Sequence, residues 1–195
     1  MESDKFLDFI DYLVFVASQR DNSQTLLAYL EHVLAGAGSE WAVGEHDDHA
    51  SMEKRVPEGV AIAATESIQS QGSAGALLGE AWHAAFGRDP DTEEAYEKAI
   101  KAIEEAGAHI VSAKNKKTTL GTMVRDMKAQ GDWKLPLGSA EADSPVRMAE
   151  ALWQGQESRH GGNGYRKPTK QEAEAAVLLA IPLVQWFSSG ILSRS

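Results

Sequence analysis

The chain has 195 residues, no cysteine and a formal net charge of −10. This length buries enough apolar surface to fold without a disulfide or a metal, and the lack of cysteine excludes thiol catalysis and cysteine-ligated zinc. The acidic balance excludes general attraction to nucleic acid, so any contact with RNA depends on a local basic patch. The acidic start lacks the features of a signal peptide, and no apolar run is long enough to span a bilayer; we expect a cytoplasmic protein.

The N-terminal part predicts two helices and a β-hairpin. Apolar residues recur at helical spacing over 4–19 and cover more than half of the helix circumference, so this helix should pack on two sides or meet a partner. A second helix follows, with Ser23 as its N-cap and Gly36 at its end. Two short segments around a polar turn then predict a small β-hairpin near residues 41–56.

The hairpin turn, residues 45–49, consists of two histidines and three carboxylates. Side chains of these types bind zinc or manganese, and the two histidines alone could share an ion on a tight turn. Five consecutive side chains cannot all converge on one ion, however. We therefore interpret the segment as a solvated turn and expect no metal and no other cofactor.

The middle of the chain predicts further helices. Three are expected, at 57–69, at 74–86 and after the capping pattern formed by Asp91 and Glu94. On the third, Glu94–Lys98 and Glu97–Lys101 should pair on the outer face at i,i+4 spacing.

The segment that follows is less regular. Residues 108–111 are short and β-prone, and strand and helix both remain open. A helix is expected over 120–130, and the acidic, Gly- and Pro-containing loop at 131–144 is a candidate subdomain boundary or mobile segment. The basic cluster here consists of Lys114, Lys116 and Lys117, with Arg125 and Lys128 after them. It is either a solvated loop or a surface that follows a phosphate backbone.

The C-terminal third predicts a helical hairpin. Its first helix starts at Ser144-Pro145, because proline is tolerated at the first helical position. After Arg159-His160 the sequence Gly-Gly-Asn-Gly ends this helix, and Thr169 with Glu172 begins the next one through a capping box. The second helix is apolar nearly all round, which predicts a buried central helix, kinked at a proline.

Arg159 and His160 allow two interpretations. Basic side chains at a helix C-terminus interact favourably with the helix dipole, and glycine suits the cap, so the segment needs no catalytic role. Alternatively, His160 acts as a general acid or base and Arg159 binds a phosphate. No nucleophile or pair of carboxylates stands beside them in the sequence.

The order Arg-His-Gly, a polar linker, Glu172-Ala-Glu-Ala-Ala-Val and a long apolar helix resembles the C-terminal domain of abortive-infection proteins. These belong to the HEPN (higher eukaryotes and prokaryotes nucleotide-binding) superfamily. The resemblance is strongest over 145–190 and looser from about 75, where 78–90 is similar to uncharacterised actinobacterial proteins. It implies a helical bundle, frequent dimerisation and, in many members, metal-independent RNA cleavage by an arginine and a histidine. His160 matches the family histidine; Arg159 precedes it directly, and Arg147 stands thirteen residues before it.

Together these patterns predict a mainly α fold, a helical bundle with a small β-hairpin. The N-terminal helices and hairpin would form one part, 1–70, and a HEPN-like bundle the other, 71–195, unless both are one continuous domain. The predicted function is that of an abortive-infection protein, of host or phage, with ribonuclease activity at His160, Arg159 and Arg147 and RNA held by Lys114, Lys116 and Lys117. The alternative is a non-enzymatic scaffold that dimerises or binds a partner. In both cases a homodimer without a membrane span is expected.

Overall fold

In the computed structural model, residues 3–46, 49–115, 117–137, 143–160 and 165–194 are described, and the side chains of 3, 46 and 157–160 are not. These ranges contain eight helices and two small antiparallel sheets, which confirms the predicted mainly α class with its hairpin. None of the helices in these ranges is both long and apolar enough to cross a bilayer. The chain forms two compact units, Met1–Glu58 with Phe86–Pro90, and Gly59–Ala85 with Asp91–Ser195.

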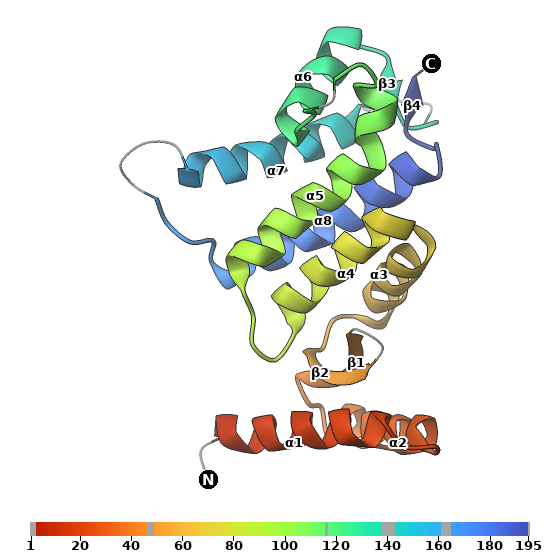
Figure 1. Ribbon diagram of the computed structural model, residues 1–195, viewed down its shortest axis with the longest axis vertical. Coiled ribbons are helices and arrows are strands. Elements are labelled where there is room, and N and C mark those ends of the chain that lie inside the picture. Colours follow the sequence, from red (N-terminus) through yellow and green to blue (C-terminus); the bar gives the residue numbers. More distant parts are fainter. Residues whose placement is uncertain (1–2, 47–48, 116, 138–142, 161–164, 195) are drawn as a thin grey trace. The chain divides into compact units, whose positions relative to one another are not determined.

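The smaller unit contains a helical hairpin and a β-hairpin, both drawn in red to orange in Figure 1. Its elements are α1 (Ser3–Ser18), α2 (Ser23–Gly36), β1 (Trp41–His46) and β2 (His49–Lys54). The two helices and the β-hairpin confirm the sequence prediction. Asn22 occupies the N-cap position, so Ser23, predicted as the cap, is the first residue of α2.

The helices of the smaller unit hold the β-hairpin by apolar and polar contacts. Val14 and Met52 are 1% exposed and form the centre of its core. The Asp11 carboxylate accepts a hydrogen bond from the Met52 N–H at 2.6 Å, and Glu31 accepts one from the Val43 N–H at 2.9 Å. Each helix therefore holds one strand, α1 holding β2 and α2 holding β1.

A segment from much later in the sequence completes the smaller unit. Gly87 forms an antiparallel bridge with Glu53 beside β2. The Arg88 guanidinium lies 2.9 Å from the Asp8 carboxylate and 5.4 Å from the centre of the Trp41 ring. Residues far apart in the chain are thus joined by a strand contact, an ion pair and a cation–π contact.

The larger unit contains the remaining helices and a second sheet of two very short strands. Its elements are α3 (Glu58–Ser70), α4 (Gly72–Phe86), α5 (Thr92–Val111), α6 (Leu120–Gln130), β3 (Trp133–Lys134), α7 (Ser144–His160), α8 (Lys170–Ser188) and β4 (Ser193–Arg194). Asp91 caps α5 by accepting from the N–H groups of Glu93 and Glu94. The predicted capping box at Thr169 and Glu172 is confirmed at the start of α8.

The structure adds detail to two segments that the sequence leaves open. Residues 108–111 continue α5, because Val111 is 5% exposed and faces the core at helical spacing. The described start of the loop at 131–144 includes β3, in which Trp133 pairs with Arg194 of β4. No local sequence pattern predicts the pairing of two strands that lie so far apart in the chain.

Helix α8 is the centre of the larger unit, as predicted from its apolar circumference. Figure 1 shows α5 (green) crossing α8 (blue), and the two helices are in contact. Gly107 of α5 makes this approach possible, because a Cβ there would lie 3.1 Å from the Phe187 ring. Phe187 is 1% exposed and meets the Trp133 ring edge-on, which ties β3 to the same core. Pro182 lies inside α8, and the helix continues past it.

Candidate functional site

Helix α7 carries the three residues predicted to be catalytic, but at its two ends. Arg147 lies in the first turn and forms an ion pair with Asp143 at 3.2 Å. Arg159 and His160 are its last two residues. With a rise of 1.5 Å per residue, Arg147 and His160 are separated by roughly 20 Å along one helix. One copy of α7 therefore does not bring Arg147 and His160 to the same phosphate. The turn 161–164 lies outside the described residues.

A hollow of about 380 Å³ lies one helical turn before position 160. We call it the α5–α7 hollow; its lining residues are Glu97, Ile100, Lys101, Glu104, Thr119, Trp153 and Gln156. Trp153 and Gln156 belong to α7, and position 160 follows them at i+7 and i+4. Residues at this spacing share one face of a helix. The face of α7 that lines the hollow therefore continues to position 160.

Neighbouring contacts determine the walls of the α5–α7 hollow. The Tyr96 hydroxyl donates to the Leu152 carbonyl at 2.9 Å, which holds α7 against α5. A Cβ on Gly121 would lie 2.4 Å from the Trp153 ring, so glycine lets the start of α6 approach that ring closely. The hollow is thus bounded by helices that are fixed to one another.

The α5–α7 hollow contains paired charges and one carboxyl with a shifted pKa. Lys101 and Glu97 form an ion pair at 2.5 Å, as the sequence predicted. The Glu104 carboxylate accepts from the Leu120 N–H at 2.6 Å. Burial raises the pKa of Glu104 above its ordinary value, against the opposing effects of that hydrogen bond and of Lys101. A carboxyl group shifted in this direction accepts and releases a proton closer to neutral pH, as acid–base catalysis requires.

Sequence reasoning did not identify the residues of this hollow. They come from α5, from the residue that caps α6 and from α7, so no short stretch of the chain contains the pattern. Glu97, Lys101 and Glu104 follow one another at helical spacing, but so do surface charges on many helices. Only the packing of three elements shows that these side chains line one hollow.

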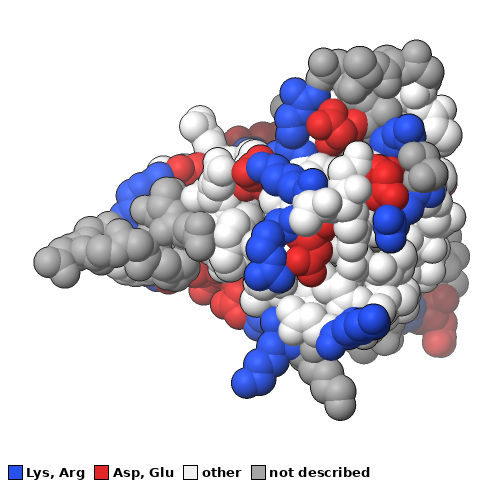
Figure 2. Space-filling view, turned by 90° about the horizontal axis from the view of Figure 1, so that it is seen from above, with Lys and Arg blue, Asp and Glu red and all other residues white. Residues whose placement is uncertain are grey.

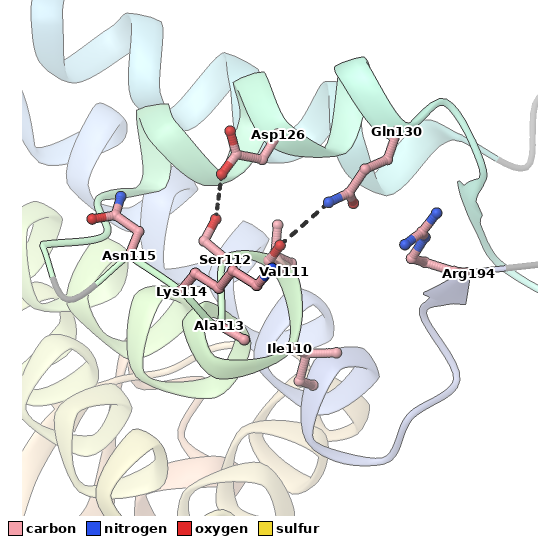
Figure 3. Close-up of a pocket in the computed structure, with 9 residues that line it drawn as sticks. All are labelled: Ile110, Val111, Ser112, Ala113, Lys114, Asn115, Asp126, Gln130 and Arg194. Atoms are coloured by element: carbon pink, nitrogen blue, oxygen red, sulfur yellow. Dashed lines mark hydrogen bonds between the residues drawn. The ribbon is translucent and has the colours of Figure 1, made fainter.

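A second hollow, of about 560 Å³, lies at the C-terminal end of α5. Figure 3 shows it between the end of α5, α6 and β4; we call it the α5-end hollow. The Ser112 hydroxyl donates to Asp126 at 2.6 Å, and the Gln130 amide donates to the Val111 carbonyl at 3.4 Å. The hydrogen bond from Ser112 lowers the pKa of Asp126 below its ordinary value, and the hydrogen bond from the Arg125 guanidinium lowers it further. Arg194 reaches this hollow from the C-terminal strand, which sequence reasoning missed.

Most cations near the α5-end hollow are already paired. Arg125, Lys128 and Arg194 bind Asp126, Glu150 and Asp132 respectively. Figure 2 shows this face with acidic side chains between the basic ones. Among the described residues, Lys114 and Lys117 form no ion pair.

Two of the described cations without an ion pair therefore lie on the connection between α5 and α6. Lys114 lines the α5-end hollow, and Thr119, a few residues later, lines the α5–α7 hollow. Of the predicted nucleic-acid-binding lysines, Lys114 thus lines one hollow, and Lys117 lies in the chain between it and Thr119 of the other. Lys116, the third, lies outside the described residues.

A metal site has no support in the described part of the chain, where no three histidine or carboxylate side chains are grouped to hold an ion. The predicted turn at 45–49 lies partly outside the described residues. The His49 ring meets the Phe15 ring edge-on, with 5.2 Å between ring centres. The histidine is therefore in contact with α1.

Two features are available for assigning a function: position 160 on the face of α7 that lines a hollow, and the basic connection that leads to this hollow. Comparisons of the chain with models of known protein families, with curated proteins and with solved structures give no match.

Proposed function

We propose that this chain is a HEPN-like protein of the abortive-infection type, which cleaves RNA without a metal during conflict between phage and host. One observation carries the proposal: position 160, which matches the family histidine, continues the face of α7 that lines the α5–α7 hollow. The Arg166 guanidinium adds support, because it binds both oxygens of Glu172 and fixes the start of α8 after the turn.

The chemistry would be transesterification within the RNA. His160 removes the proton of a ribose 2′-hydroxyl, whose oxygen attacks the adjacent phosphorus. The bond from phosphorus to the 5′-oxygen breaks, leaving a 2′,3′-cyclic phosphate on one fragment. The departing 5′-oxygen takes up a proton, and Arg159 stabilises the charge on the phosphate oxygens. Arg147, at the other end of α7, would act on this phosphate only from a second copy of the chain.

The lysines Lys114 and Lys117 would hold the RNA backbone. Each ammonium group neutralises a phosphate and releases a counterion, so binding should weaken as salt rises. Because the remainder of the chain is acidic, this connection is where a polyanion meets the least repulsion. A bound strand would then lie beside the α5–α7 hollow.

Incubation of the purified protein with end-labelled RNAs, with EDTA present, tests the proposal. We expect fragments that end in a 2′,3′-cyclic phosphate, and a loss of rate of at least ~100-fold in His160→Ala, because a general base contributes about that much. His32→Ala is the matched control, since His32 is exposed on α2 of the smaller unit. Circular dichroism confirms that both variants are folded.

A wild type that leaves varied RNAs intact, or a His160→Ala variant as active as wild type, would refute the ribonuclease. In the same assay, Lys114→Glu combined with Lys117→Glu should weaken RNA binding. The charge-matched pair Lys5→Glu and Arg20→Glu, on the smaller unit, should leave binding nearly unchanged.

A non-enzymatic scaffold is the second candidate function, and the smaller unit favours it. Its helices expose large apolar side chains such as Phe9 and Tyr29, at 53% and 67%. Exposed apolar surface of this kind usually marks an interface. A chain that is inert on RNA and forms a stable assembly through this surface would support the scaffold.

A further inference from the structure

The two helices of the smaller unit carry apolar side chains that their own core does not use. Ile10, Val14, Leu27, Leu30 and Leu34 pack against the β-hairpin. A second set remains exposed by 42% to 67%, and we call it the outer stripe: Phe6, Phe9, Tyr12, Leu13, Leu26, Tyr29 and Val33. Helix α2 has no buried residue over its whole length. Solvent thus covers apolar surface that the fold leaves without a partner.

Helical spacing makes the outer stripe a continuous surface. In α2 its members stand one position before Leu27, Leu30 and Leu34, which turns them by about 100° from the side that packs on the β-hairpin. In α1, Phe9 and Leu13 likewise stand one position before the inward Ile10 and Val14. Two acidic residues show which side of each helix lies next to the strand edges. Asp8 of α1 binds Arg88 beside β2, and Glu31 of α2 accepts a hydrogen bond from the N–H of Val43 on β1.

On α2 the stripe lies on the side opposite Glu31. On α1, Phe9 and Leu13 are turned away from Asp8, whereas Tyr12 follows Asp8 at i+4 and shares its side. Helices α1 and α2 are joined by a short turn and are in contact, so both halves of the stripe belong to one helical hairpin. The result is a mainly apolar surface, with Lys5 on its α1 side, one helical turn before Phe9.

The size of the outer stripe matches a stable interface. Its side chains expose about half of their area, and an aromatic side chain alone offers roughly 150–250 Å². The exposed apolar area is therefore on the order of 700 Å², close to the ~800 Å² that each partner contributes to a standard protein interface. This exceeds the patches of a few hundred Å² that most monomers expose.

The net charge of α1 and α2 opposes their binding to a membrane. Residues 3–36 contain five acidic and two basic side chains, a net charge of −3. Helices that lie on bilayers carry lysine and arginine on their polar face, and anionic lipid would repel this unit. A second copy of the chain carries the same charge, but it presents an equally apolar surface of the same length, so apolar burial is what favours this partner.

We infer that the chain forms a two-fold symmetric dimer in which the outer stripes of α1 and α2 from two copies pack together as a four-helix bundle. Such an interface is isologous, so one patch serves both copies and assembly stops at two. Antiparallel helix pairs pack in this way in four-helix bundles. The inference does not depend on the proposed ribonuclease activity.

Sedimentation equilibrium of the whole chain over the micromolar range tests the interface. We expect a dimer for wild type and a monomer for Phe9→Glu combined with Tyr29→Glu, with a dissociation constant raised at least ~100-fold, as for buried aromatic anchors. The matched control is Ile62→Glu with Ile110→Glu, whose residues are 51% and 41% exposed in the larger unit. The control should remain a dimer, and circular dichroism checks all three proteins.

Cross-linking gives a second readout that does not depend on a destabilising charge. The chain has no cysteine, so Tyr29→Cys introduces a single thiol on the outer stripe. A bifunctional maleimide should join two such chains efficiently and two Ile62→Cys chains poorly.

Several results would overturn the inference. A wild type that is monomeric throughout, or a Phe9→Glu and Tyr29→Glu variant that dimerises as before, excludes this interface. Preferential cross-linking of Ile62→Cys places the contact elsewhere. A monomer that sediments with anionic vesicles, and no longer does so after Phe9→Glu, would make the stripe a lipid-binding surface.

Discussion

Single polar side chains join segments of this chain where apolar contacts are few. The Arg55 guanidinium donates to the carbonyls of Ser39 and Trp41 and to the Glu31 carboxylate, so one residue fixes the start of the first strand to α2. Arg166 and Thr169 similarly surround Glu172 at the start of α8. Such contacts respond to pH when one partner titrates.

Glu172 should make the stability of the larger unit depend on pH in the acidic range. The Arg166 guanidinium first, and the Thr169 amide next, lower the pKa of Glu172 from 4.5 to about 2. Between pH 4.5 and about pH 2 the unfolded chain then binds more protons than the folded chain. The stability that ionised Glu172 contributes is therefore complete above pH 4.5 and is lost as the pH falls towards 2. Glu172→Gln should lower the urea midpoint at neutral pH and flatten its decline in acid.

The controls for this prediction use two other carboxyl groups. Glu66 is exposed on α3, and Glu66→Gln should reproduce the acid profile of wild type. Glu104 should act in the opposite direction. Because burial raises its pKa, the folded chain holds this proton more tightly than the unfolded chain, so stability falls as pH rises. Glu104→Gln should therefore raise the urea midpoint most near neutral pH. Parallel profiles for wild type and Glu172→Gln would contradict the prediction.

At the scale of elements, α3 and α4 approach each other through a glycine. A Cβ on Gly75 would lie 2.1 Å from the carbonyl oxygen of Ile68, a backbone atom that cannot move without displacing its helix. A Cβ on Gly59, also helical, would meet nothing within 4 Å. Gly75→Ala should therefore destabilise by ~1–3 kcal/mol through overpacking, whereas Gly59→Ala should be neutral or stabilising by up to ~1 kcal/mol.

Urea unfolding of the two glycine variants compares them directly, since each adds one methyl group to a helix. The same midpoint in both would mean that α4 shifts away from α3 at little cost. A destabilised Gly59→Ala would mean that the start of α3 has a contact beyond those described here.

The elements that sequence predicts well are those with local signals. Thr119 and Thr169 cap their helices with their own side chains, and both helices begin where predicted. Partners from other elements are different. Lys98, expected to pair with Glu94 on the same helix, binds Glu80 of α4, which a local pattern cannot reveal. The candidate site has the same division: the glycines after His160 predict the end of α7 locally, whereas the hollow before it depends on three packed elements.

For the whole molecule, the two compact units should differ in stability. The smaller core centres on three buried residues, Val14, Ala50 and Met52, whereas α8 alone buries eight. Fewer buried apolar side chains mean a lower free energy of local opening. Native-state hydrogen exchange should show the amides of α1, α2 and β2 opening at a lower free energy than those of α5 and α8.

The exchange experiment should be repeated at several protein concentrations, because dimerisation through the outer stripe would protect the amides of the smaller unit. The monomeric Phe9→Glu and Tyr29→Glu variant should enlarge the difference between the units. Equal opening energies in that variant would show that the chain unfolds as a single cooperative block.

The bridge between Gly87 and Glu53 has a consequence for how the protein is made. On the ribosome, residues up to 58 emerge well before 86–90, so the smaller unit waits for its last segment while α3 and α4 are still being synthesised. In that interval the outer edge of β2 lacks its partner, and an open strand edge is a template for pairing with another chain. A recombinant fragment that stops at residue 70 would keep this edge open permanently. Such a fragment should precipitate more readily than one that extends beyond Pro90.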